Sequence, residues 1–107
     1  MKLAFLLLLT WFTASLSNLD EPTYRVKRTF SDAQVRETES QVLQQFGVKV
    51  GIKVIKRNSE GEITDLICVR YDKAGRKTGS CSSDNFGLLI IAKTGCTIAD
   101  LGHENEI

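Results

Sequence analysis

The chain has 107 residues, of which 42% are hydrophobic and 25% are charged, and its formal net charge is +1. A chain of this length forms one domain with a modest core and cannot hold a deep cleft between two domains. Acidic and basic residues are interspersed, and no basic stripe carries aromatic platforms, which argues against a nucleic-acid partner.

Residues 1–17 predict a secretory signal peptide. Lys2 supplies a positive charge, residues 3–12 form an apolar run interrupted only by Thr10, and small residues follow, so we expect cleavage after Ser17. The run is shorter than the roughly 20 residues that a helix needs to cross a bilayer, although an uncleaved membrane anchor is the alternative. We therefore expect a secreted or periplasmic protein with no stable membrane insertion after cleavage.

A single α+β domain is expected at residues 18–96, followed by a polar carboxy-terminal tail at residues 97–107. The domain begins with alternating apolar and charged residues over 24–30, which predict a short edge strand. Arg25 to Arg28 (RVKR) also resembles a basic processing site, and cleavage there would leave a domain that begins at Thr29. We favour the strand.

Residues 32–46 predict an amphipathic helix. Ser31 is a suitable N-cap, and Gln34, three residues later, completes a capping box. Apolar residues recur at helical spacing on one side of this segment, and charged and amide residues fill the other side. Gly47 follows the last apolar residue, at the position where a left-handed residue commonly ends a helix.

Beyond the helix the apolar pattern changes to a period of two, which predicts β-strands. Strands are expected at residues 48–55, 63–71, 77–83 and 86–93. Turn-forming residues that include Gly61 and Gly75 separate the first three of these strands. The predicted order is β-α-β-β-β-β, a two-layer α+β domain in which the amphipathic helix packs on one antiparallel sheet of four to five strands.

The strand at residues 63–71 has a predicted inner face that one carboxylate interrupts. The side chains expected on the inner face are Ile63, Ile67, Val69 and Tyr71. Those expected on the opposite face are Leu66, Cys68 and Arg70. Asp65 interrupts the inner face, and an unpaired buried carboxylate there would have a raised pKa and could act as an acid or base. A bulge or strand end that turns it outward is the alternative.

Three cysteines follow the predicted signal peptide, and an oxidising compartment favours their pairing. A four-residue loop at residues 73–76 places Cys68 directly opposite Cys81, with β-carbons about 5 Å apart, so this is the first candidate disulfide. Cys81–Cys96 is the rival pair. The odd cysteine would be an inert thiol, a nucleophile or the link of a disulfide-bonded dimer.

No catalytic or metal-binding constellation stands out in the sequence. His103 is the single histidine and lies in the polar tail, whereas a zinc site needs several converging ligands. The carboxylates that could supply an acid–base pair are Glu60, Glu62, Asp65, Asp72 and Asp84. We expect no catalytic residue, no metal site and no cofactor.

Residues 56–64 (KRNSEGEIT) follow a capped helix and a strand, and they precede another strand, a glycine turn and a serine-rich strand. This order over residues 24–93 resembles the small extracytoplasmic carboxy-terminal domain of some BlaR/MecR-type membrane metallopeptidases of Bacteroidetes. The resemblance implies an α+β sensor or interaction domain in the cell envelope. It does not imply proteolysis, because the zinc motif and the membrane helices of those peptidases do not occur in this sequence.

The leading hypothesis is an exported, non-enzymatic interaction or sensor-like domain whose partner is a protein of the cell envelope or extracellular space. An inhibitor of a secreted hydrolase is the alternative, because small disulfide-bonded α+β domains suit that role. A small enzyme that uses Cys96 or Asp65 is the further alternative.

Overall fold

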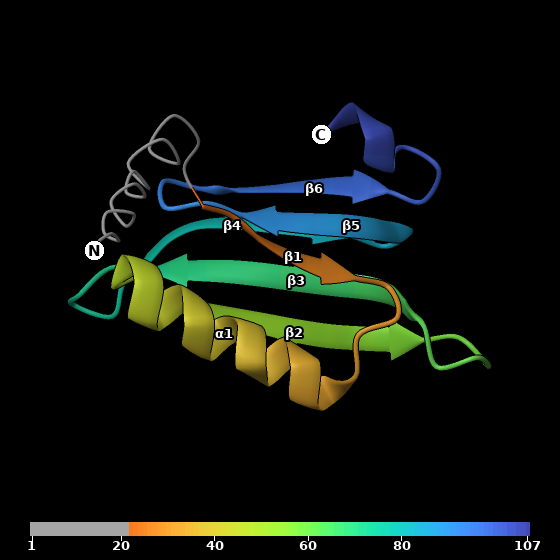
Figure 1. Cartoon of the computed structure of the whole chain (residues 1–107), viewed down its shortest axis with the longest axis horizontal. Helices are drawn as coiled ribbons and strands as arrows, with labels where there is room; N and C mark the ends of the chain where they lie inside the picture. Colours follow the sequence, from red (N-terminus) through yellow and green to blue (C-terminus); the bar gives the residue numbers. More distant parts are fainter. Residues whose placement is uncertain (1–21) are drawn as a thin grey trace, which may run out of the picture.

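A computed structural model describes residues 22–107, so the predicted signal peptide at residues 1–17 lies outside the described residues. The elements, in chain order (Figure 1), are β1 (Tyr24–Lys27), α1 (Asp32–Phe46), β2 (Lys49–Arg57), β3 (Ile63–Tyr71), β4 (Lys77–Ser83), β5 (Phe86–Ile91), β6 (Cys96–Asp100) and the 3-10 helix η3 (Glu104–Glu106). The α+β class is confirmed.

Helix α1 has the predicted bounds and both predicted ends. The Ser31 hydroxyl accepts a hydrogen bond from the backbone N–H of Gln34 at 3.2 Å, and Gln34 Oε1 accepts one from the backbone N–H of Ser31 at 2.8 Å. Gly47 has φ of 69° and donates its N–H to the Leu43 carbonyl at 2.9 Å. The capping box and the left-handed glycine therefore satisfy backbone groups at both helix ends that would otherwise lack partners.

The strands of the described residues form two antiparallel sheets of three strands each, and the prediction of one sheet of four to five strands is wrong. One sheet has the order β2-β3-β4 and is built from consecutive hairpins, as predicted. The other sheet has the order β1-β5-β6, because β5 pairs with β1 and not with β4, the strand that precedes it in the chain. A pairing between strands so far apart in the chain leaves no local signal in the sequence.

The sixth strand corrects a second prediction, because it occupies the start of the expected polar tail at residues 97–107. Ala99 is buried and Ile98 is half-buried, and β6 pairs with β5 in a register that sets Ile98 against Leu89. This segment is short and has polar ends, so its strand conformation depends on the neighbouring strand more than on its own composition.

One hydrophobic core lies between the two sheets. Its largest fully buried side chains are Phe86, Ile63, Leu66, Leu89, Ile91, Val26, Val35, Val42 and Cys68. Helix α1 packs against β2 and β1 and thereby covers the side of the core on which these two strands lie, as Figure 1 shows. β4 and β6 approach each other at another side, where they belong to different sheets.

From Leu66 to Tyr71, β3 buries the opposite face from the one predicted, whereas Ile63 is fully buried as predicted. Leu66 and Cys68 are fully buried in the core, whereas Ile67, Val69 and Tyr71 are half-buried on the outer face of the sheet. Both faces carry apolar residues, so alternation alone did not distinguish them. The neighbouring strands decide, since the buried Ile52 of β2 lies directly opposite Cys68.

The basic run at Arg25 to Arg28 lies in and just after β1, which confirms the strand prediction over Tyr24–Lys27. Val26 is fully buried, and Arg28 forms an ion pair with Glu62 at 3.2 Å. Cleavage after Arg28 would separate β1 and its core residue from the rest of the domain.

Candidate functional site

The disulfide of this domain joins Cys81 to Cys96, with α-carbons 6.4 Å apart. This is the rival pair, and the first candidate, Cys68–Cys81, is not formed. Cys68 does lie directly opposite Cys81 in the β3–β4 register, as predicted, but β6 brings Cys96 to the other side of Cys81. The sequence did not show this approach, because the segment around Cys96 was expected to end the domain.

The disulfide also occupies Cys96, so this residue presents no thiol for nucleophilic chemistry. Cys68 is the free cysteine and is fully buried. Burial raises the pKa of its thiol to about 11, while the nearby Arg70 guanidinium opposes this shift and Glu39 adds to it. A thiol of this kind is a poor nucleophile at neutral pH.

Two of the carboxylates considered for acid–base chemistry, Asp65 and Asp72, lie in β3 and in the turn that follows it. Asp65 is half-buried on the outer sheet face, across from Lys56, and therefore does not interrupt the core. Asp72 accepts hydrogen bonds from the backbone amides of Ala74 and Arg76, both at 2.9 Å, which stabilises the β3–β4 turn. These positions are not brought together into one site.

His103 is paired with a single partner near the carboxy terminus. Its Nδ1 lies 2.8 Å from Glu106 Oε2, and this hydrogen bond raises the pKa of the imidazole from its ordinary value of 6.5. Across residues 22–107, no group of three or more His, Cys, Asp or Glu side chains is placed to hold a metal ion.

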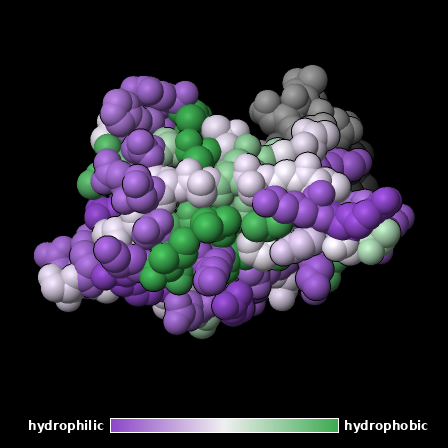
Figure 2. Space-filling view, turned by 180° about the vertical axis from the view of Figure 1, so that it is seen from behind, coloured by the Kyte–Doolittle hydropathy of each residue, from purple (hydrophilic) through white to green (hydrophobic). Residues whose placement is uncertain are grey.

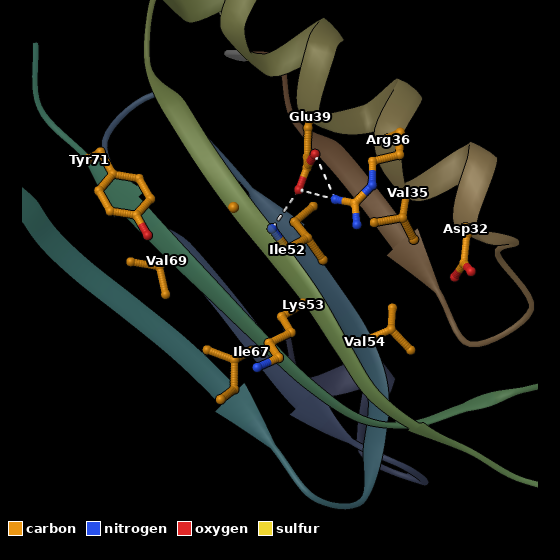
Figure 3. Close-up of a pocket in the computed structure, with 11 residues that line it drawn as sticks. Asp32, Val35, Arg36, Glu39, Ile52, Lys53, Val54, Ile67, Val69 and Tyr71 are labelled. Atoms are coloured by element: carbon orange, nitrogen blue, oxygen red, sulfur yellow. Dashed lines mark hydrogen bonds and ion pairs between the residues drawn. The ribbon is translucent and has the colours of Figure 1, made fainter. Parts of the chain in front are cut away.

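A groove of about 700 Å3 lies between helix α1 and the outer face of the β2–β3 pair, and we call it the β2 groove (Figure 3). Its helical wall consists of Asp32, Val35, Arg36 and Glu39. Its opposite wall is the row of outer-face side chains of β3, which are Ile67, Val69 and Tyr71. Residues 51–54 of β2 form the floor between the two walls.

Gly51 opens the groove across β2. It pairs with Val69 and lies beside Tyr71, where an added Cβ would be 3.6 Å from Tyr71 Cε2. The absence of a side chain at this position leaves the aliphatic row of β3 accessible from the β2 side. The space-filling view from behind (Figure 2) shows hydrophobic surface across the middle of the side of the molecule that it displays, with hydrophilic surface around it.

The helical wall of the groove is fixed by Glu39. Its Oε2 accepts a 2.7 Å hydrogen bond from the backbone N–H of Ile52, and it also lies 3.0 Å from Arg36 Nη1. β2 is an edge strand, so this N–H points away from β3 and would otherwise have no strand to pair with. The carboxylate therefore attaches the helix to the edge of the sheet and prevents ordinary strand addition at this point.

Positive charge flanks the apolar row. Lys49 and Lys53 lie on β2 on either side of Gly51, and both side chains are exposed. Lys49 Nζ lies 5.9 Å from the centre of the Tyr71 ring, in the range of a cation–π contact. Among residues 22–107 neither lysine has a carboxylate within ion-pair distance, whereas Asp32 and Glu39 are already paired with arginines.

Sequence reasoning did not find this groove, although its signal was present in the two apolar faces of residues 63–71.

Comparisons of the chain with protein-family models, with curated proteins and with solved structures found no match. Within the described residues, no helix has the length and apolar character needed to cross a membrane.

Proposed function

We propose that this protein is an exported, non-enzymatic interaction domain that binds an extended segment of a partner protein in the β2 groove. The observation that carries the proposal is the half-buried row of Ile67, Val69 and Tyr71 on the outer face of the sheet, beside a glycine that keeps the row accessible. Exposed apolar surface bounded by polar residues is typical of protein-binding sites. The disulfide between the two sheets supports the export part of the proposal, because structural disulfides persist in oxidising compartments.

The charges around the groove define the chemistry of the partner. The unpaired Lys49 and Lys53 favour an acidic side chain, and the β3 row favours aliphatic or aromatic side chains at alternating positions. We therefore propose a partner segment in extended conformation that carries apolar residues and at least one Asp or Glu. A protein of the cell envelope or extracellular space would supply this segment.

The test selects peptides from a random phage-displayed library on the immobilised protein and measures their affinities by isothermal titration calorimetry. We expect the selected peptides to combine alternating apolar residues with an acidic residue. Gly51→Val should reduce their affinity at least tenfold, because its side chain would fill the groove next to Tyr71.

Gly79→Val is the matched control, because an added Cβ at Gly79 of β4 meets no atom within 4 Å and lies outside the groove. Lys53→Glu should weaken the same peptides without changing the fold, since Lys53 is exposed. Selected peptides that bind the Gly51→Val and Lys53→Glu variants as tightly as the parent protein would refute the groove as the binding site.

A further inference from the structure

The three cysteines of this domain lie next to one another in space, although only two of them are bonded. Cys68 of β3 is the direct cross-strand neighbour of Cys81 of β4, and Cys81 is bonded to Cys96 of β6. Cys68 is fully buried in the core, and both bonded cysteines pack against that core. Cys81 therefore has two cysteine neighbours, one in its own sheet and one in the other sheet.

The hydrogen-bond pattern of the sheet fixes the geometry of the Cys68–Cys81 pair. The Ile52 N–H donates to Glu39 and not to β3, so Ile52 and Cys68 form a non-hydrogen-bonded pair. Cys68 must then direct its N–H and C=O toward β4, which makes Cys68–Cys81 a hydrogen-bonded pair. The α-carbons of such a pair are about 5.5 Å apart, which falls within the range that a disulfide bridges.

We propose that the domain has two disulfide isomers, Cys81–Cys96 and Cys68–Cys81, which interconvert by intramolecular thiol–disulfide exchange. In the forward step, Cys68 loses its proton to solvent and its thiolate attacks Cys81 Sγ. The Cys68–Cys81 bond forms, the Cys81–Cys96 bond breaks, and Cys96 leaves as a thiolate that takes up a proton. The step is redox-neutral and needs no external oxidant or reductant.

The two isomers hold the domain together differently. The Cys81–Cys96 bond connects the β2-β3-β4 sheet to the β1-β5-β6 sheet, whereas a Cys68–Cys81 bond lies within one sheet. After exchange, the β5–β6 turn would be held to β3 by Arg70, which donates hydrogen bonds to the carbonyls of Ala92 at 3.1 Å and Lys93 at 2.7 Å. Exchange therefore releases the start of β6 and leaves the β3–β4 hairpin crosslinked.

Burial keeps this exchange slow in the native state. Because the pKa of Cys68 is about 11, only about one molecule in 10⁴ carries the thiolate at pH 7, and this fraction rises tenfold for each pH unit below the pKa. The charged groups that act on this thiol are Arg70 of β3, which favours the thiolate, and Glu39 of α1, which disfavours it. Opening of the β3–β4 region would remove this protection.

Tryptic peptides distinguish the isomers, because Cys68, Cys81 and Cys96 fall on separate peptides spanning residues 58–70, 78–93 and 94–107. The oxidised protein is incubated at pH 7, 9 and 10, quenched with acid, alkylated with N-ethylmaleimide in denaturant and digested without reduction. At pH 7 we expect alkylation on peptide 58–70. At pH 10 we expect peptide 58–70 linked to 78–93 and alkylation on 94–107.

The appearance of the second isomer should accelerate about tenfold per pH unit and be independent of protein concentration. Cys68→Ser should abolish it, and Cys96→Ala should form the Cys68–Cys81 bond in oxidised glutathione while keeping the parent circular dichroism spectrum. The proposal is overturned by alkylation confined to Cys68 at every pH, or by an exchange rate proportional to protein concentration. A folded Cys96→Ala protein that retains two free thiols also overturns it.

Discussion

Glu39→Ala removes the hydrogen bond that joins helix α1 to the middle of the edge strand β2, whereas the ion pair between Asp32 and Arg57 joins the helix to the end of that strand. The lost interaction is a 2.7 Å hydrogen bond from a backbone N–H to a carboxylate whose side chain is 20% exposed. Hydrogen bonds to charged groups contribute about 1.5–3 kcal/mol, and the higher helix propensity of alanine returns a few tenths of a kcal/mol. We expect the free energy of unfolding to fall by about 2 kcal/mol.

For a domain of this size, about 2 kcal/mol corresponds to a fall in Tm of about 8–16 °C. Urea unfolding monitored by circular dichroism, with the disulfide intact, measures the free energy directly. Glu39→Gln keeps an acceptor oxygen but not the charge, so it should lose about half as much stability as the alanine variant.

Two control variants separate the hydrogen bond from the other effects of Glu39. Arg36→Ala removes the ion pair to an arginine that is 68% exposed, so it should cost less than about 0.5 kcal/mol. Glu37→Ala makes the same substitution at an exposed site of the same helix and should be nearly neutral. If Glu39→Ala destabilises the domain no more than Glu37→Ala, the attachment of α1 to β2 through this carboxylate is refuted.

Two further predictions concern the carboxy-terminal part of the domain. Gly87→Ala should destabilise the domain by about 1–3 kcal/mol, because its Cβ would lie 2.7 Å from the Asp100 carbonyl oxygen. Gly79→Ala is the control, because its Cβ meets no atom within 4 Å. Equal urea midpoints for the two variants would contradict the prediction. NMR titration should give His103 a pKa above 6.5, and Glu106→Gln should lower it toward 6.5. Since the folded-state pKa of His103 is raised, the charged His103–Glu106 contact should be present at low pH and lost as the pH rises through that pKa. An unchanged His103 titration in Glu106→Gln would contradict the prediction.

Features that depend on neighbours along the chain could be predicted from the residue types. The helix at Asp32–Phe46 follows from a capping box, an amphipathic repeat and a glycine that adopts the left-handed conformation. The hairpin between β3 and β4 follows from its turn residues, and its register correctly placed Cys68 opposite Cys81. Turns and caps are local hydrogen-bonding solutions, so the residue types alone specify them.

The remaining features arise from contacts between segments that are distant in the chain, so they became visible only in the folded domain. The sequence did not show that β5 pairs with β1, that β6 is a strand, or that Cys81 is bonded to Cys96. The β2 groove was missed for the same reason, because both faces of β3 are apolar and the rest of the fold selects which one is buried. Alternation specifies that a strand has two faces, whereas contact with other strands determines which face is exposed to a partner.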